Sequence, residues 1–272
     1  MKVLGLVGES LEHSFSTKLH SEILKEGKIL GNYNLFSVKK EFEYKIVESL
    51  KVLGVNGANV TIPYKEKVFN QLDFLSEEAR GIGAVNTIFI KNGITYGYNT
   101  DYYGFGKMME KEKVIIEGNS FFVLGAGGAA RSVLKYLLDK KAKKIVLVSR
   151  NKDKAKKNFE NFLIDYMSYE ELEEIKEGFA IINTTPCGMY PKINSMATSE
   201  EVIKKFKVAI DLIYNPLETK FLKVGRENGL KTLNGLFMLV GQGVKAEEIW
   251  NDIKFSDDME EKIYKKLEKF FT

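Results

Sequence analysis

The chain of 272 residues contains few cysteines, histidines and prolines, and each shortage excludes a class of protein. A single cysteine, Cys187, cannot form an internal disulfide or a multi-thiolate zinc site, which favours a reducing cytoplasmic location. The two histidines, His13 and His20, lack the i, i+4 spacing of a helical zinc site, so we expect no metal. The chain has only 4 prolines, and 44% of its residues are hydrophobic. This composition excludes disordered and collagen-like chains.

A large charge imbalance and a long apolar run are also missing. Lys and Arg number 41 and Asp and Glu 37, a net charge of +4 that argues against a general nucleic-acid binder. The lysine-rich stretch 135–157 is interpreted as solvated helix faces. The uncharged stretches 179–191 and 232–244 are shorter than the ~20 apolar residues that span a bilayer. We therefore expect a soluble cytoplasmic protein that binds neither nucleic acid nor membrane.

Short apolar runs alternate with amphipathic segments along the first hundred residues. Strands are predicted at 3–7, 33–38 and 55–60, and helices at 17–30 and 41–53. This order is typical of parallel strands joined by helical crossovers. Asn92-Gly93, between 84–90 and 94–99, then predicts a β-hairpin, because both residues accept positive φ. The fold class is therefore α/β, with a mainly parallel sheet in the first domain.

The alternation restarts after Asp101 with a polar helix that runs to about Lys113. Strands are predicted at 121–124, 144–149, 179–184 and 208–213, and helices at 129–140, 152–161, 236–250 and 257–271. Ser168-x-x-Glu171 predicts a capping box that opens one more helix. At about 150 residues per domain the length suggests two domains, and we place the boundary near Asp101.

A glycine-rich string follows the strand at 121–124 and opens the next helix. It fits G-x-G-x-x-[G/A], in which glycines let the backbone approach a pyrophosphate at the helix N-terminus. The residues expected to bind the cofactor here are Gly125, Ala126, Gly127, Gly128 and Ala129. A purely structural glycine turn is the alternative. We predict a Rossmann-type, doubly wound dinucleotide domain over 102–236.

The end of the second strand of that domain selects between NAD and NADP. NAD binders place a carboxylate there for the ribose hydroxyl, whereas this chain has Ser149-Arg150 and Asp153 falls inside the helix. Arg150 and Lys154 can pair with a 2′-phosphate, so we predict NADP as the cofactor. The alternative interpretation is that Arg150 is an ordinary surface charge.

Polar side chains also follow the predicted strands of the first domain. Thr61 and Lys65 follow the strand at 55–60, while Asn86 and Asp101 lie near the ends of the hairpin. Pro63 is interpreted as the first residue of a helix. Because parallel α/β sheets carry their sites at strand carboxyl ends, these residues suggest a pocket for a small polyhydroxylated ligand. Turns and helix caps are the structural alternative.

Six ordered strings carry a resemblance to a known family. NVTIPYK, GAVNT, GYNTD, GAGGAAR, NTTPCGM and DLIYNPLETKFL, together with the HSFS at 13–16, resemble shikimate dehydrogenases as far as Trp250. The resemblance implies reversible reduction of 3-dehydroshikimate to shikimate with NADPH, in the biosynthesis of chorismate and the aromatic amino acids. It implies a substrate-binding and catalytic domain at 1–101, with 237–272 packing back onto it, beside the NADP domain.

The resemblance also implies roles for individual residues. Lys65 becomes the catalytic acid or base and Asp101 its partner; which of the two transfers the proton stays open. The implied substrate-binding residues are Ser14, Ser16, Thr61, Asn86, Tyr214 and Gln242. The implied cofactor contacts beyond the glycine loop are Ser149, Arg150, Lys154, Thr184, Ile213, Gly235 and Met238. From the residues alone, Ser14 and Ser16 would be helix caps.

The chain departs from the family pattern at a few positions. Ser10 and Thr17 replace usual prolines, and Asn151 replaces a residue whose hydroxyl contacts the 2′-phosphate. Two rival functions therefore stay open: an NAD-preferring quinate/shikimate dehydrogenase and a non-catalytic NADP-binding regulatory protein. Tyr136-x-x-x-Lys140 imitates a short-chain dehydrogenase pair, but it lies inside the first helix after the glycine loop. The sequence leaves the oligomeric state open, a homodimer included.

Overall fold

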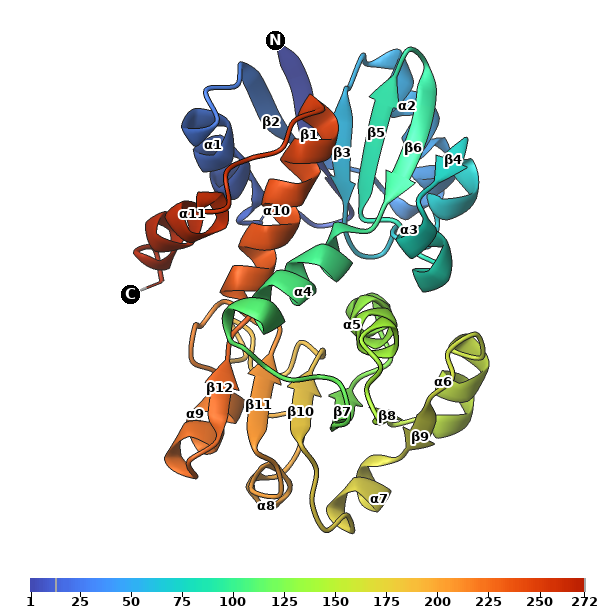
Figure 1. Ribbon diagram of the computed structural model, residues 1–272. Helices are drawn as coiled ribbons and strands as arrows, with labels where there is room; N and C mark the ends of the chain where they lie inside the picture. The colour runs from blue at the N-terminus through green and yellow to red at the C-terminus, as the bar shows by residue number, and fades with distance from the viewer. Residues whose placement is uncertain (13, 272) are drawn as a thin grey trace. The chain divides into compact units, whose positions relative to one another are not determined.

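The computed structural model describes residues 1–12 and 14–271, which fold into two compact units (Figure 1). Unit 1 comprises Met1–Gly104 and Val240–Phe270, and unit 2 comprises Phe105–Leu239. The division falls inside two helices, α4 (Thr100–Lys111) and α10 (Leu236–Asn251). The boundary predicted near Asp101 lies in the first turn of α4.

The sheet of unit 1 is mixed. Over the described residues its order is β2 (Gly31–Ser37), β1 (Lys2–Gly8), β3 (Gly57–Val60), β5 (Thr87–Lys91), β6 (Ile94–Tyr98) and β4 (Phe74–Leu75). The predicted parallel pairing holds for β1 with β2 and β3. The predicted hairpin adds antiparallel pairs of β5 with β3 and β6. The predicted mainly parallel sheet is therefore parallel in its first three strands, and the hairpin makes it mixed.

Asn92-Gly93 closes the hairpin as the sequence predicts. Lys91 pairs directly with Ile94, and the two residues between them have φ of 53° and 78°. Both turn residues are therefore left-handed, as a two-residue type I′ turn requires. The register then places Thr87 opposite Tyr98, so the start of β5 lies beside the end of β6.

Helices cover both faces of this sheet because the strands alternate their apolar side chains. Val7 and Val60 pack on one face with α2 (Ile46–Val52) and α3 (Glu77–Ile82). Leu4 and Leu6 point to the other face, toward α1 (Ser16–Glu26) and α10. The remaining helical segments of unit 1 are α11 (Met259–Glu268) and the 3₁₀ turns Lys40–Lys45 and Phe69–Gln71.

Three predictions for unit 1 helices need correction. The helix predicted at 17–30 ends at Glu26, because Gly27 caps it and Lys28 turns to a φ of 53°. The helix predicted at 41–53 begins as a 3₁₀ turn and becomes α-helical at Ile46. Pro63 does not begin a helix: residues 62–68 form successive turns, and the next helical segment is the 3₁₀ turn Phe69–Gln71.

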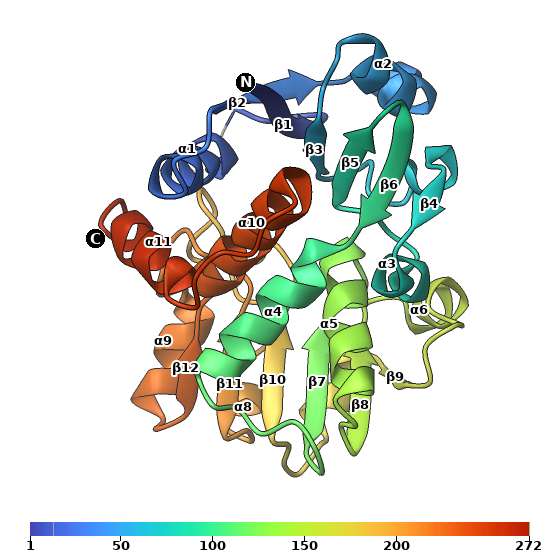
Figure 2. The same ribbon diagram turned by 45° about the horizontal axis from the view of Figure 1, so that its top comes forward.

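The helix α10, labelled in Figure 2, carries Trp250, which anchors the C-terminal segment in the core of unit 1. Its side chain is fully buried, and its indole Nε1 donates to the Ile88 carbonyl at 2.8 Å. Gly57 in β3 lies directly under the indole, where a Cβ atom would overlap the ring. The glycine is therefore required by the close approach of this one side chain.

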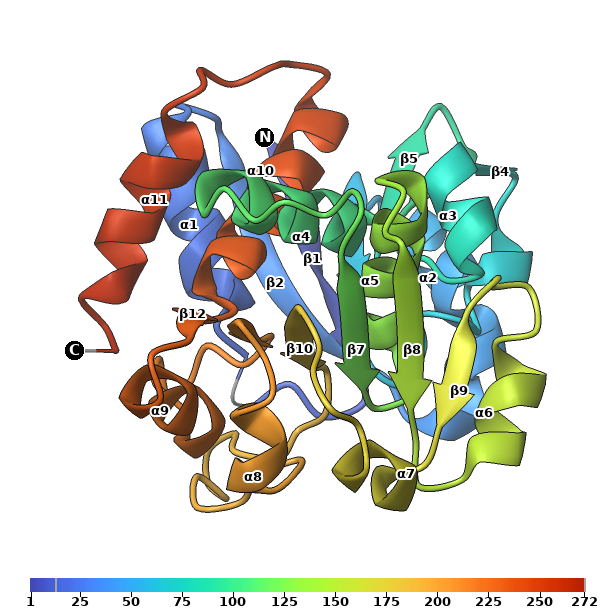
Figure 3. The ribbon, with the colours of Figure 1, turned by 60° about the horizontal axis from the view of Figure 1, so that its bottom comes forward.

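Unit 2 has an all-parallel sheet, part of which is visible in Figure 3. Over the described residues its order is β12 (Lys231–Leu233), β11 (Val208–Asp211), β10 (Ala180–Asn183), β7 (Ser120–Leu124), β8 (Lys144–Val148) and β9 (Asp165–Met167). Numbered from β7, this is the doubly wound order 3-2-1-4-5-6 of dinucleotide-binding domains. The strand order reverses between β7 and β10, which confirms the predicted Rossmann-type fold.

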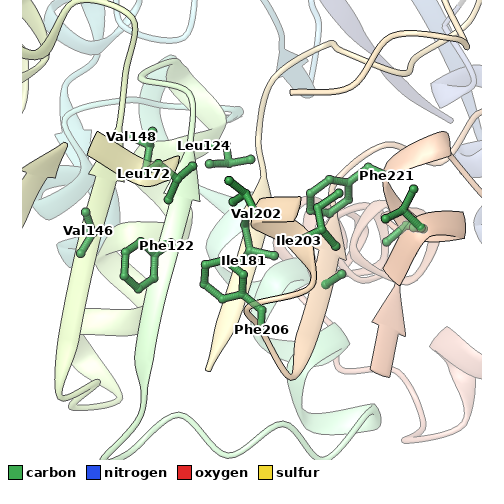
Figure 4. Close-up of a cluster of buried hydrophobic side chains, with 13 residues drawn as sticks. Phe122, Leu124, Val146, Val148, Leu172, Ile181, Val202, Ile203, Phe206 and Phe221 are labelled. Carbon is green, nitrogen blue, oxygen red and sulfur yellow. The ribbon is translucent and has the colours of Figure 1, made fainter. Parts of the chain in front are cut away.

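Helices pack on both faces of this second sheet as well. They are α5 (Gly128–Asp139), α6 (Lys152–Asn158), α7 (Tyr169–Glu173), α8 (Glu200–Ile203) and α9 (Lys220–Glu227). Phe122, Ile181 and Phe206 belong to the apolar cluster on one face (Figure 4). The predicted capping box of Ser168 and Glu171 is present at α7.

We expect Gly57→Ala to lower the free energy of unfolding of unit 1 by about 1–3 kcal/mol, because the added methyl group must displace the buried indole. Trp250 is the only tryptophan, so its fluorescence during urea unfolding reports on unit 1. Gly31→Ala is the matched control, since its Cβ would lie 3.4 Å from its nearest neighbour. Equal stability of both variants would contradict the packing argument.

Candidate active site

Lys65 and Asp101 form an ion pair in unit 1. The Lys65 Nζ donates to Asp101 Oδ2 at 2.6 Å, and the two side chains are 18% and 13% exposed. The Lys65 carbonyl accepts the amide of Val85 at 2.8 Å, which holds its turn beside the start of β5. Asp101 reaches the same place from the first turn of α4, directly after β6. The half-buried pair therefore remains accessible to a ligand.

Asn86 joins this pair through a buried amide. Its Nδ2 donates to Asp101 Oδ1 at 2.9 Å, and its Oδ1 accepts the amide of Thr100 at 2.7 Å. The backbone of Asn86 also bridges two strand ends, with bonds to Val60 and Tyr98. Three of the sequence-predicted residues, Lys65, Asn86 and Asp101, therefore lie in one hydrogen-bonded group.

Sequence reasoning missed the polar residues beneath this group. Asn59 is 5% exposed, accepts from Tyr33 Oη at 2.7 Å and donates to Thr87 Oγ1 at 3.0 Å. Thr87 and Thr100 are fully buried, with 3.0 Å between their hydroxyl oxygens. The only available signal was the repeated Asn-Thr pairing in the strings NVT, VNT and YNTD.

The other substrate residues implied by the resemblance lie on separate elements. Ser16 begins α1 and its amide donates to Ser14 Oγ at 3.2 Å, so Ser14 also acts as a local cap. Thr61 follows β3 and its amide bonds to the Val7 carbonyl at 2.9 Å. Gln242 lies on α10 and is 9% exposed.

In unit 2 the glycine loop lies between β7 and α5, as predicted. Gly125 has a φ of 96°, which only glycine adopts readily, and its amide bonds to the Val148 carbonyl. Neither Gly127 nor Gly128 has a positive φ angle, and a Cβ atom at either position would meet open space. Nothing within the protein requires glycine at these two positions. The open space leaves room for the close approach of a ligand to the backbone.

The loops after β7 and β10 touch at the point where the strand order reverses. Thr184 Oγ1 donates to the Leu124 carbonyl at 2.7 Å, and its amide bonds to the same oxygen. The Thr185 methyl group lies 2.6 Å from the place of a Cβ on Gly125. This reversal is where doubly wound sheets bind their ligands.

The turn after β8 presents positive charge and no carboxylate at the strand end. Arg150 and Lys154 are both exposed there. Asn151, the departure from the family pattern, caps α6 by accepting the Lys154 amide at 2.9 Å and is bonded to Ser149. Asp153 lies within the first turn of α6, as expected. Together with the open space at Gly127 and Gly128, these residues fit a nucleotide that carries a 2′-phosphate.

A buried carboxylate that sequence reasoning missed organises the next two loops. Asp211 ends β11 and accepts from Asn183 Nδ2 at 3.0 Å, the Ile213 amide at 3.1 Å and Thr219 Oγ1 at 2.7 Å. Asn183 in turn accepts the amide and hydroxyl of Thr185. Burial raises the pKa of Asp211 to about 6, and its three donors limit the rise.

The remaining cofactor residues implied by the resemblance are Ile213, Gly235 and Met238. Ile213 is 6% exposed, and its carbonyl accepts the amide of Gly235 at 2.9 Å. A Cβ on Gly235 would overlap the backbone of Leu212, so packing alone requires this glycine. Met238, on α10, is 8% exposed, and burial raises the pKa of Tyr214.

The other candidate groups play structural parts. His20 is fully buried, pairs with Glu247 at 2.7 Å and stacks on Tyr33. Tyr136 faces Glu110 from α5, and burial raises its pKa. The described residues hold no group of three or more His, Cys, Asp or Glu that could bind a metal. His13 lies outside the described residues.

Comparison with known proteins identifies the family. Residues 6–88 match the model of the shikimate dehydrogenase substrate binding domain, and residues 108–212 match that of shikimate / quinate 5-dehydrogenase. The chain is 71% identical to a shikimate dehydrogenase (NADP(+)) of Clostridium perfringens, with 98% of both chains covered. The chain belongs to the shikimate dehydrogenase family. A relative of the same name from Clostridium beijerinckii is 48% identical over 100% of both chains.

Solved structures of this family share the fold. A chorismate mutase/shikimate 5-dehydrogenase fusion protein from Clostridium acetobutylicum is 47% identical, with a TM-score of 0.95 over 100% of this chain and 98% of that one. The Thermus thermophilus shikimate 5-dehydrogenase, solved with NADP(H) and shikimate, is 28% identical. Its TM-score is 0.87 over 98% of this chain and 99% of that one. Among the described helices, none has the length and apolar character needed to cross a membrane.

Asp211 makes a testable contribution to the pH dependence of stability. Its pKa is raised in the folded protein, so the folded state binds the proton more tightly than the unfolded state does. The stabilisation that this group contributes is fully present below pH ~3.8, and it is lost as the pH rises through about 6. The total is on the order of 3 kcal/mol.

We therefore expect Asp211→Asn to remove this loss from urea unfolding curves, followed by circular dichroism between pH 4 and pH 7. The stability of the asparagine variant relative to the wild type should increase as the pH rises, because the asparagine has no proton to release. Parallel stability curves for the two proteins over this range would refute the assignment.

Proposed function

We propose that this protein is an NADP-dependent shikimate dehydrogenase that reversibly reduces 3-dehydroshikimate to shikimate. The observation that carries the proposal is the Lys65–Asp101 ion pair, held by Asn86, in a chain 71% identical to an enzyme of that name. The reaction is a step in the biosynthesis of chorismate and the aromatic amino acids. The Lys65 ammonium has further N–H groups besides the one that it donates to Asp101. Such a donor suits this oxidoreductase chemistry better than a purely regulatory binding role.

Lys65 and Asp101 handle the proton of the reaction. A ketone carbon that accepts a hydride leaves an alkoxide, whose oxygen must receive a proton. The Lys65 ammonium donates a hydrogen bond to this oxygen and stabilises its negative charge, and a positioned donor of this kind contributes roughly 10²–10⁴ in rate. Asp101 holds the ammonium through Oδ2 and leaves the other ammonium protons for the substrate.

Further residues of unit 1 hold the ring of the substrate. We assign Ser14 and Ser16 to its carboxylate and Thr61, Asn86 and Gln242 to its hydroxyl groups. Asn86 has an amide N–H beyond the one given to Asp101, so it can bind a hydroxyl while fixing the carboxylate. Tyr214 of unit 2 is assigned to the substrate carboxylate as well.

Unit 2 binds NADP. The backbone of Gly125, Ala126, Gly127, Gly128 and Ala129 holds the pyrophosphate, and Ser149, Arg150 and Lys154 surround the 2′-phosphate. Thr184, Ile213, Gly235 and Met238 line the nicotinamide end. The bound cofactor supplies or accepts the hydride. We place the enzyme in the cytoplasm, where its single cysteine stays reduced; a homodimer stays a prediction.

An absorbance assay at the reduced-nicotinamide band tests the reaction directly. The purified protein is mixed with shikimate and NADP⁺, and in parallel with NAD⁺ or quinate. We expect rapid reduction of NADP⁺ by shikimate. Preferential turnover of NAD⁺ or quinate would instead favour a quinate/shikimate dehydrogenase, and binding of NADP without any turnover would favour a regulatory protein.

In the same assay we expect Lys65→Ala to lower kcat by roughly 10²–10⁴ while shikimate still binds, because the lost contact belongs to the transition state. Lys67→Ala is the matched control. Lys67 lies in the same turn but forms a surface pair with Glu43 at 3.2 Å. Full turnover by the Lys65 variant would end the assignment of this residue.

We expect Arg150→Ala to raise the KM for NADP⁺ roughly tenfold, since one charged contact to the 2′-phosphate is lost. The KM for NAD⁺ should hardly change, because NAD⁺ lacks that phosphate. Lys144→Ala, at the opposite end of β8, controls for the loss of one positive charge. Equal increases for both cofactors would show that Arg150 does not recognise the 2′-phosphate.

A further inference from the structure

We propose that Thr87 is a positioning residue of this active site, whose hydroxyl sets the orientation of the Asn86 amide and thereby of Asp101 and Lys65. The inference rests on the proposed function, because it assigns a task to Thr87 only through the Lys65–Asp101 pair. Thr87 itself is fully buried. Its hydroxyl bonds to Asn59, Asn86 and Thr100 and therefore acts on the ion pair through Asn86.

The Thr87 hydroxyl lies at the centre of three hydrogen bonds. It donates to Asn86 Oδ1 at 2.9 Å, accepts from Asn59 Nδ2 at 3.0 Å and lies 3.0 Å from Thr100 Oγ1. A hydroxyl has one proton and two acceptor positions. The Asn59 amide donates to Thr87 at this distance. When the Thr100 hydroxyl donates to Thr87 as well, both acceptor positions of Thr87 are filled and its single proton is left for Asn86 Oδ1.

Asn86 Oδ1 therefore accepts from two donors. Besides Thr87, the Thr100 amide donates to it at 2.7 Å, whereas the Thr100 hydroxyl, 3.2 Å away, directs its single proton to Thr87. A flipped amide would place an N–H group against these donors in a fully buried site, where unsatisfied polar groups are costly. The amide of Asn86 is held with its Nδ2 facing Asp101.

This orientation reaches the reacting groups through one carboxylate. Asn86 Nδ2 engages Asp101 Oδ1 at 2.9 Å, and Lys65 Nζ engages Oδ2 at 2.6 Å. With one oxygen fixed by the amide, the carboxylate cannot rotate without breaking a bond. The ammonium of Lys65 is consequently held in one place, which matters because small misplacements of catalytic groups cost much of the rate.

The sheet supplies the position of Thr87. Asn59 in β3 pairs with Thr87 in β5, and Thr87 pairs with Tyr98 in β6, just before Thr100 and Asp101. Asn59 is itself oriented by Tyr33 Oη, which donates to its Oδ1 at 2.7 Å. A series of side-chain hydrogen bonds therefore runs from Tyr33 in β2 to the ion pair of Lys65 and Asp101.

Thr87→Val and Thr87→Ser separate this role from simple packing. Valine keeps the shape but removes the hydroxyl, so we expect kcat to fall about 10- to 100-fold, with the KM for NADP⁺ unchanged within about twofold. Serine keeps the hydroxyl and loses a methyl group, so its kcat should stay within about threefold of the wild type.

Thr95→Val is the control for a lost hydroxyl in the same sheet. Thr95 is 1% exposed and bonds to Asp73, outside the network of Thr87. We expect this variant to lose stability in urea but to keep its kcat. A folded Thr87→Val protein with wild-type kcat, or a serine variant as slow as the valine variant, would overturn the proposal.

The two proposals fail in different ways. If the wild type shows no turnover, or if Lys65→Ala keeps full activity, the proposed function itself is wrong. If the wild type is active and Lys65→Ala is slow while Thr87→Val is not, the function stands and only the positioning role falls. Should Thr87→Val fold poorly, Thr87→Ala removes the same hydroxyl, and a wild-type kcat in that variant would also overturn the proposal.

Discussion

A buried polar group must find a hydrogen-bond partner, and this constraint organises both units of the protein. In unit 1 the side-chain oxygen of Asn86 accepts from the Thr87 hydroxyl and the Thr100 amide, which leaves its amide nitrogen to hold Asp101. In unit 2 the carboxylate of Asp211 accepts three bonds, from Asn183 at the end of β10 and from two residues after β11. Both groups lie at strand ends, so satisfying them determines the conformation of the loops that carry the candidate site residues.

Sheet topology brings these groups together. In unit 1 a two-residue turn puts the start of β5 beside the end of β6. Asn86 and Thr100 are therefore hydrogen-bonded although fourteen positions separate them in the chain. In unit 2 the order reversal between β7 and β10 brings Thr184 against the glycine loop. Different sheets therefore reach the same result, with polar residues gathered where strands end.

Local patterns predicted the elements whose causes are themselves local. The Asn92-Gly93 turn, the capping box at Ser168 and the glycine loop each depend on a few adjacent residues. Thr87 and Asp211 could not be found this way, since their partners come from distant strands and both look like ordinary strand residues. A proline suits a helix start and a turn equally well, so Pro63 predicted a helix where residues 62–68 form successive turns.

Unit 1 is discontinuous in the chain, and this has a consequence for the order of its assembly during synthesis. The ribosome completes residues 105–239 of unit 2 before it adds Trp250, which covers Gly57, and Glu247, which pairs with His20. Until then the nascent chain exposes one apolar face of its first sheet. The half of the protein that is translated first is thus completed only by the last helices to be translated.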